Sequence, residues 1–271
     1  MSAKLVGAVA VAGWMLAAGL PASVARSAEV AAPPPPPKAA KPFNKRDISG
    51  TWDRYPQAID TQRDRTVVAP PPDIPPPPLK PEYKGPYEAS QARIAAANAR
   101  NEPIATGYTH CLPDGMPAMM QAMFPMEVLQ GGRQITIVQE AYNQVRRIYI
   151  GDKVPAIEDA EPLFWGHSAG RWVGDRLIVD TVGIKETVRF RDVPHSDQMR
   201  IHEEMTVLGP NHFQNRITVT DPVYLSGPWT WTWIYQRRAG YKMQEYVCED
   251  NREYADPVTG EARLRVTVPN Q

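Results

Sequence analysis

Three side chains that could take part in catalysis lie close together in segment 166–182. They are His167, Arg171 and Asp180, and the Gly-Asp pair at 174–175 between them suits a two-residue β-turn. Glycine fits such a turn because it adopts positive φ at little cost. The resulting hairpin places His167, Arg171 and Asp180 on one face, since successive side chains of a strand alternate. A carboxylate near a histidine suits proton transfer, and a guanidinium suits an anion.

The two-residue loop also predicts how the hairpin pairs. Val173 faces Arg176, Trp172 faces Leu177, Arg171 faces Ile178, Ala169 faces Asp180 and His167 faces Val182. Trp172, Leu177 and Val179 then share the face opposite the charges, which we interpret as the core face. What the charged face can do depends on whether it lines a cavity or meets water.

Residues 194–208 form the second candidate segment. Read as a strand from Gln198 to Leu208, it places Glu203 on a face otherwise made of Met, Ile and Val side chains. A carboxylate there is costly unless it is paired or protonated, which suits either a general acid–base group or a structural ion pair. Arg147 and Arg171 are the candidate partners in the structural alternative.

His195 stands just before that strand, with Asp197 two residues later. We predict one catalytic group at the end of a barrel, composed of His167, Arg171, Asp180, His195 and Glu203. The two histidines would move protons, Asp180 would orient His167, Arg171 would hold an anion, and Glu203 would be the second acid–base residue. The plain alternative is that each histidine hydrogen-bonds the backbone of a loop. Histidines with carboxylates could also hold a metal ion, but the spacing matches no zinc motif, so no metal and no cofactor are predicted.

Aromatic residues alternate along segment 229–235. Trp229, Trp231 and Trp233 form a face that is either core packing or one wall of a pocket for a ring-bearing or apolar ligand. Glu140 and Arg147 are further candidates for ligand binding. The methionines between positions 116 and 126 are interpreted as core filler, with a soft-metal role as the alternative, because thioethers select ions such as Cu(I).

The composition narrows the class of protein. The chain has 271 residues with Lys+Arg 30 and Asp+Glu 30, so its formal net charge is zero and nothing indicates nucleic-acid binding. The two cysteines, Cys111 and Cys248, predict a disulfide if the protein is exported, worth about 5 kcal/mol in the chain-entropy model. The alternatives are two unrelated thiols, or Cys111 acting as a nucleophile beside His110.

Residues 1–25 have the features of a secretory signal peptide. Lys4 precedes an apolar run from Leu5 to Leu20, and the small residues that follow predict cleavage near Ala25. An uncleaved membrane anchor is the alternative, but the apolar run is short for a membrane span. We predict a periplasmic or secreted protein with no stable membrane insertion after cleavage. Residues 26–45 are proline-rich and are predicted to be an extended, disordered spacer.

Residues 46–271 are predicted to form one mainly β domain. Short candidate strands at near-regular spacing, separated by turn signals, are typical of a single antiparallel β-barrel or a β-sandwich. The candidates are 47–52, 127–130, 134–140, 145–150, 169–173, 176–182, 187–190, 198–208, 212–220, 230–237, 242–249 and 262–268. One Ala-rich helix is predicted over 87–100, after a second proline-rich passage at 67–86. No β-α-β alternation is visible, so a parallel α/β fold is not expected.

Two resemblances follow from these motifs. Gly50-Thr51-Trp52 on the opening strand resembles the Gly-x-Trp of lipocalins and wider calycin barrels, which implies that Trp52 closes the barrel floor. The motifs Cys111–Pro117, Gly166–Thr181 and Pro194–Asp197 resemble those of a large set of exported bacterial proteins of unassigned function. That second resemblance implies a secreted single β domain and carries no catalytic assignment.

Three functions follow as hypotheses. The first is a metal-independent acid–base enzyme, such as a lyase, hydratase or isomerase, acting on a small, partly apolar molecule in the barrel mouth. The second is a periplasmic binding or carrier protein that uses the same cavity without chemistry. The third is a structural envelope protein whose spacer sets a distance from the membrane. A small-molecule ligand is the expected partner in the first two, and the sequence makes no prediction of the oligomeric state.

Overall fold

The computed structural model describes residues 44–56, 69–102, 111–248, 253–255 and 262–264. The predicted signal peptide with its cleavage site, and the predicted spacer as far as residue 43, lie outside these residues. Within the described ranges, no helix is both long and apolar enough to span a membrane.

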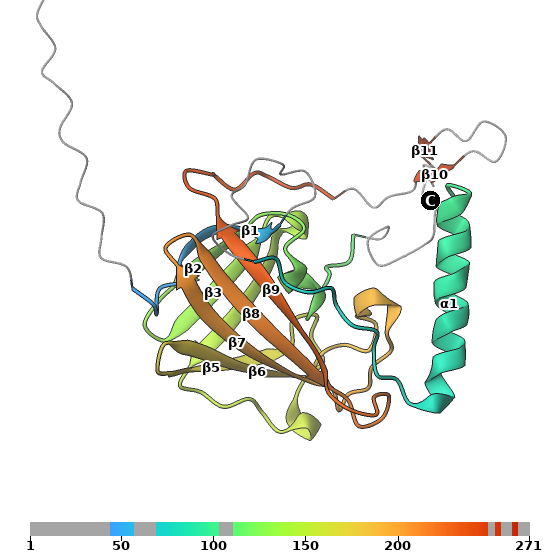
Figure 1. Cartoon of the computed structure of the whole chain (residues 1–271), viewed down its shortest axis with the longest axis horizontal. Helices are drawn as coiled ribbons and strands as arrows, with labels where there is room; N and C mark the ends of the chain where they lie inside the picture. Colours follow the sequence, from blue (N-terminus) through green and yellow to red (C-terminus); the bar gives the residue numbers. More distant parts are fainter. Residues whose placement is uncertain (1–43, 57–68, 103–110, 249–252, 256–261, 265–271) are drawn as a thin grey trace, which may run out of the picture. The chain divides into compact units, whose positions relative to one another are not determined.

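In the described part of the chain, nine strands close into a single barrel, which confirms the predicted β-barrel. The strands are β1 Gly50–Tyr55, β2 Met126–Gln130, β3 Gln134–Gln139, β4 Gln144–Ile150, β5 His167–Val173, β6 Arg176–Val182, β7 Arg200–Gly209, β8 His212–Thr220 and β9 Trp229–Arg237. The ring closes where β9 pairs with β1 (Figure 1). In this pair Trp52 lies opposite Arg237. A separate two-stranded sheet consists of β10 Glu253–Ala255 and β11 Ala262–Leu264.

One neighbouring pair of the barrel, β4 and β5, is parallel, whereas the other neighbouring pairs are antiparallel. Ile148 pairs with Ser168 and Tyr149 with Ala169. A parallel pair cannot be joined by a tight hairpin, so the chain must return along the barrel before β5 begins. Residues 151–166 make this return with the 3₁₀ turn η4 Ile157–Asp159 along the way. An irregular crossover therefore lies beside the β4–β5 seam.

The β5–β6 hairpin has the predicted register. His167 pairs with Val182 and Ala169 with Asp180, and the Gly-Asp pair forms the two-residue turn. Val179 is fully buried, whereas the side chain of Asp180 is 39% exposed. The predicted split into an apolar and a charged face is therefore confirmed. The apolar face points into the barrel, and the charged face points out of it.

Aromatic side chains fill much of the barrel interior. Trp52 is fully buried, and Trp229, Trp231 and Trp233 are 3% exposed or less. The three tryptophans of β9 contact Phe190, with ring centroids 5.7, 5.2 and 5.7 Å away respectively. Of the two predicted roles of these tryptophans, core packing is therefore the one observed, because their rings contact one another and Phe190.

The methionine-rich segment contributes to the same core. Met116, Met119, Met120 and Met126 are 1% exposed or less, as expected for core filler, whereas Met123 is 71% exposed. The 3₁₀ turn η2 Ala118–Gln121 lies within this segment, and a second one, η3 Ala141–Asn143, joins β3 to β4. Flexible thioethers suit this irregular path better than branched side chains would.

The helix α1 spans Pro81–Ala99 and begins earlier than predicted. Pro81 lies in its first turn, where the missing N–H has no helical partner to lose. Pro86, interpreted as the residue before the helix, lies inside it. Tyr83 and Tyr87 pack against the core and connect the helix to the barrel domain.

Two predicted strands are wrong. Segment 187–190 leads into the 3₁₀ turn η5 Phe190–Asp192, in which Arg191 and Asp192 have positive φ. Residues 242–248 are irregular rather than extended in a sheet. The predicted disulfide holds the end of this second segment, because Cys111 and Cys248 are bonded with their Cα atoms 5.7 Å apart.

Candidate functional site

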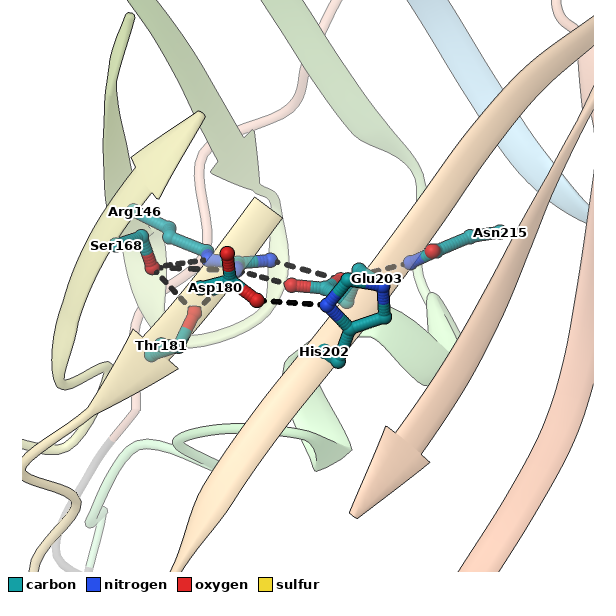
Figure 2. Close-up of polar contacts among 7 residues, drawn as sticks. All are labelled: Arg146, Ser168, Asp180, Thr181, His202, Glu203 and Asn215. Carbon is teal, nitrogen blue, oxygen red and sulfur yellow. Dashed lines mark hydrogen bonds and ion pairs between the residues drawn. The ribbon is translucent and has the colours of Figure 1, made fainter. Parts of the chain in front are cut away.

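Glu203 forms an ion pair with Arg146 inside the barrel (Figure 2). The two side chains are 0% and 1% exposed. Nη1 of Arg146 donates to Oε1 of Glu203 over 3.1 Å, and Nη2 donates to Oε2. The structural interpretation of Glu203 as an ion-pair member therefore matches the geometry. Its partner is Arg146, not the predicted Arg147 or Arg171.

Three neutral side chains complete this interior network. Arg146 Nε donates to Ser168 Oγ over 3.2 Å, and Nη2 donates to Thr181 Oγ1 over 3.1 Å. Asn215 Nδ2 donates to Oε1 of Glu203 over 2.8 Å. Both carboxylate oxygens and all three guanidinium nitrogens thus have partners, which is what a buried charge requires. The same carboxylate adds to the effect of burial in raising the pKa of Tyr235.

The outer face carries a second charged cluster around Asp180 (Figure 2). His202 Nδ1 donates to Oδ1 of Asp180 over 2.6 Å, and Arg171 Nη1 donates to Oδ2 over 2.9 Å. Partial burial acts to raise the pKa of Asp180, but the hydrogen bonds from His202 and Arg171 and their coulombic effects outweigh burial and lower it. The prediction that Asp180 orients His167 is wrong, because the histidine bonded to Asp180 is His202.

His167 is bonded elsewhere. Its Nε2 lies 2.9 Å from the carbonyl oxygen of Glu161 in the crossover. A carbonyl oxygen only accepts, so Nε2 carries the proton and Nδ1 is left as the acceptor of the ring. The predicted convergence of His167, Asp180, His195 and Glu203 is therefore not found. Glu203 points inward, Asp180 points outward, and the two histidines line separate hollows.

His195 lines a small cavity at the barrel end where β7 and β9 begin. The cavity volume is about 20 Å³ and its lining is Met116, Pro117, Phe190, Val193, Pro194, His195, Met199, Val219, Asp221, Leu225 and Trp229. Nδ1 of His195 lies 3.0 Å from the carbonyl oxygen of Ser196. Nε2 is buried and has no hydrogen-bond partner among the described residues. About one water molecule fits a space of this size, so an organic substrate does not.

The ligand-binding candidates separate in the same way. Glu140 accepts hydrogen bonds from Tyr241 Oη over 2.7 Å and from the backbone N–H of Gln244 over 2.8 Å, so it secures the C-terminal segment. Trp231 and Trp233 are core residues, and Trp229 reaches the small cavity. Arg147 lines a larger cleft, on the outer surface of the barrel.

This cleft lies between the β4–β5 seam and the crossover. Its volume is about 280 Å³, and its lining is Val145, Arg147, Tyr149, Asp152, Lys153, Val154, Pro155, Leu163, Trp165, Gly166, His167, Ser168 and Ala169. The parallel pairing of β4 and β5 explains the cleft, because the crossover needed to join them forms its second wall. Two of the predicted site residues, His167 and Arg147, meet here.

Two glycines set the close packing around His167. Gly166 has φ +61°, and a Cβ there would lie 2.4 Å from the carbonyl oxygen of Val182. Gly183 has φ +71°, and a Cβ there would lie 3.0 Å from Cδ2 of His167 and 2.9 Å from Cβ of Ala160. A side chain at Gly166 would push the crossover away from β6, and one at Gly183 would displace the His167 ring.

The aromatic wall of the cleft is also held in place. Trp165 Nε1 donates to Oε1 of Gln144 over 3.4 Å. Gln144 is 1% exposed, and its Nε2 donates to Oε1 of Gln139 over 2.7 Å and to Oδ2 of Asp114 over 3.2 Å. The 3.4 Å contact is long for a hydrogen bond, but its acceptor is fixed by neighbours on both sides. The side chain of Trp165 is therefore held in place at the wall of the cleft.

The charges of the cleft favour an anion. Arg147 and Lys153 line it, and within the described ranges neither has an ion-pair partner at 4.0 Å or less. Asp152 contributes one opposing charge. Lys153 and Trp165 were not predicted as site residues, because the crossover that carries them has no periodic pattern. Tyr149 was not predicted either, because it lies on β4 and the parallel pairing of β4 with β5 has no local signature.

The comparisons with known proteins assign no family. No family model matches this chain, and no curated protein matches it. The resemblance to exported bacterial proteins of unassigned function stays a prediction. The cleft and its charges are therefore the basis for a functional proposal.

Proposed function

We propose that this protein binds a small organic anion with an apolar or ring-bearing body, in the outer cleft between β4–β5 and the crossover. The observation that carries the proposal is the pairing of two unneutralised cations, Arg147 and Lys153, with the aromatic residues Tyr149 and Trp165 in one cleft of about 280 Å³. Small-molecule sites combine mainly apolar walls with a few polar groups that fix orientation.

Each part of the cleft has a role in this proposal. Arg147 suits a carboxylate because its planar guanidinium can donate two parallel hydrogen bonds. Tyr149, which is 45% exposed, and Trp165 offer ring faces for the body of the ligand. Nδ1 of His167 can accept a hydrogen bond from a hydroxyl or amine of the ligand.

The geometry favours binding without chemistry over acid–base catalysis. Asp180 contacts His202 rather than His167, and Glu203 is neutralised by Arg146 in the interior. The remaining histidine of the predicted catalytic group, His195, lines a cavity of about 20 Å³. The predicted proton-transfer groups thus have no shared place for a substrate. We propose a carrier or binding protein of the periplasm, which the disulfide supports because such bonds persist in oxidising compartments.

Binding of matched ligands to matched variants tests the proposal. Thermal-shift and calorimetric titrations compare benzoate and phenylacetate with the neutral isostere benzamide. The carboxylates should bind and benzamide should not. Arg147→Gln should lower carboxylate affinity by about 10- to 100-fold, the equivalent of the 1.5–3 kcal/mol of a charged hydrogen bond. Arg200→Gln removes an exposed arginine that does not line the cleft and should leave affinity unchanged.

Two results would contradict the proposal. Equal binding of benzamide and benzoate would show that the cations of the cleft do not select the ligand. Equal loss of affinity in Arg147→Gln and Arg200→Gln would show that only the overall charge of the protein matters.

A further inference from the structure

The small cavity at the barrel end combines a free histidine nitrogen with two thioether residues. His195 is 8% exposed, and its Nε2 has no partner among the described residues. Met116 and Met199 line the same cavity and are 0% and 4% exposed. A buried acceptor without a partner costs free energy, so its persistence calls for an occupant of the cavity.

Within the described part of the chain, the ring of His195 has one hydrogen bond, and its partner is a backbone carbonyl. Nδ1 of the ring lies 3.0 Å from the carbonyl oxygen of Ser196, which can only accept, so Nδ1 carries the proton. Nε2 is then the unprotonated nitrogen, and it carries the lone pair. A histidine bound to a metal through one nitrogen typically donates its other N–H to a backbone carbonyl in this way.

The segment that carries His195 is rigidly held. The next residue, Ser196, donates its backbone N–H to Oδ2 of Asp221 over 2.6 Å and its hydroxyl to Oδ1 over 3.0 Å. Asp221 Oδ1 also accepts from the backbone N–H groups of Val223 and Tyr224 over 2.8 and 3.1 Å. The position of His195 is therefore set before any ion arrives, and the carboxylate brings negative charge to the cavity wall.

The donor types select the kind of ion. Within the described residues, no group of three or more His, Cys, Asp or Glu side chains could hold a metal ion, so the ligand sets preferred by harder ions are not found there. Thioethers fall outside that search, and they select soft ions such as Cu(I). Imidazole also suits copper. A cavity of about 20 Å³ accommodates one ion or one water molecule and nothing larger.

From these observations we infer that the cavity is a Cu(I) site in which Nε2 of His195 and the sulfur atoms of Met116 and Met199 are the ligands. The three ligands are neutral, so a monovalent cation keeps its charge, and Asp221 in the wall partly balances it. The site is separate from the anion-binding cleft and does not depend on it. No redox step is involved, because the ion enters and stays as Cu(I).

Competition titration of the full chain tests this site. Cu(I) is supplied under ascorbate and without oxygen, and a chelator of known affinity, bathocuproine disulfonate, competes for it. Ag(I), which has the same charge and softness, is the second probe. We expect one tightly held ion per chain. Met116→Leu, Met199→Leu and His195→Phe should each lower the affinity at least about tenfold, a loss already seen when residues merely supporting a ligand are changed.

Two methionines serve as controls. Met126→Leu repacks a buried methionine that does not line the cavity, and Met123→Leu removes an exposed thioether from the same segment. Both should bind Cu(I) like the unmodified protein, because exchange of methionine for leucine nearly conserves volume. Circular dichroism of each variant shows whether it has folded.

X-ray absorption of the unmodified protein loaded with Cu(I) keeps the test independent of any variant. The expected first coordination sphere has one nitrogen and two sulfur atoms. Binding that is weak, or equal in all five variants, would identify an adventitious ion only and overturn the inference. A coordination sphere without sulfur would overturn it as well. NMR spectra of the protein with and without Cu(I) are the last check, and unchanged resonances of the His195 ring would also overturn the inference.

Discussion

Two charged clusters lie on opposite faces of the barrel wall, with Glu203 and His202 of β7 as neighbours in the chain that belong to different clusters. The interior network joins Arg146 to Glu203, and the outer cluster joins Arg171 and His202 to Asp180 (Figure 2). In each, a carboxylate accepts hydrogen bonds from an arginine and from one further side chain, Asn215 in the interior and His202 outside. They differ in exposure, because the interior pair is 1% exposed or less while the outer side chains are 39–58% exposed.

Exposure decides what each cluster contributes. Removing one partner of a buried pair leaves an uncompensated charge in a medium of low dielectric, which costs far more than the pair itself contributes. An exposed pair is screened by water and salt and contributes about 0–1 kcal/mol. Side chains alternate along β7, so Glu203 points in and its neighbour His202 points out. Two carboxylates, Glu203 inside and Asp180 outside, therefore contribute very differently to stability.

The largest expected effect is the loss of the interior carboxylate. Glu203→Gln leaves the charge of Arg146 buried without a counter-charge, so we expect the free energy of unfolding to fall by about 3–5 kcal/mol. Urea unfolding followed by circular dichroism measures it. A change below about 1 kcal/mol would show that the interior is wetter than the burial of these side chains indicates.

A double substitution tests whether the cost of losing Glu203 comes from the charge of Arg146 that is left behind. Arg146→Met with Glu203→Leu removes both charges, and we expect it to be more stable than either single variant, because an apolar pair of similar volume fits a buried site without desolvation. The hydroxyls of Ser168 and Thr181 bond each other over 2.8 Å, so they keep a partner. Additive losses in the double variant would contradict the proposed coupling.

A smaller effect is expected at the outer cluster. Asp180→Asn should lower the free energy of unfolding by less than about 1 kcal/mol, and the loss should shrink further in 1 M salt. Thermal unfolding at low and high salt measures both quantities. A loss as large as that of Glu203→Gln would remove the distinction between the two clusters.

The outer cluster also predicts a pH dependence. The pKa of Asp180 is lower in the folded chain than in the unfolded chain, so its contribution is present above the ordinary carboxyl pKa of about 4 and is lost as the pH falls through the folded value. Between pH 6 and pH 3 the unmodified protein should therefore lose slightly more stability than Asp180→Asn. Melting temperatures measured from pH 6 to pH 3 test this. An equal fall of the melting temperature in the unmodified protein and in Asp180→Asn would contradict this role of Asp180.

Local pairing could be predicted from the sequence, while long-range partners could not. The two-residue turn at 174–175 determines the register of its hairpin, and strand alternation places Glu203 on an apolar face. The alternation of side chains along the strands also predicts the positions of two further residues. Arg146 shares the inward face of β4 with Ile148, and His202 shares the outward face with Asp180 across the β6–β7 pair.

The remaining features depend on contacts between distant segments. The parallel pairing of β4 with β5 has no local signature, so neither the crossover cleft nor its residues Lys153 and Trp165 could be placed. The same holds for the cavity that Met116 and His195 line, because Met116 comes just before η2 whereas His195 lies between η5 and β7. Residues 242–248 resemble a strand in sequence, but hydrogen bonds to Glu140 and the disulfide hold them in place, and in the part of the chain that the structure describes they do not pair with a neighbouring strand.

The central claim is that the ligand site lies on the outer cleft and not inside the barrel. Its most direct test is a titration of the ¹⁵N-labelled protein with benzoate, followed by amide, indole and guanidinium resonances. We expect shifts concentrated at Arg147, Tyr149, Trp165 and His167, with those of Glu203 and Asn215 unchanged. Shifts centred on the interior network, or none at saturating benzoate and phenylacetate, would contradict the claim.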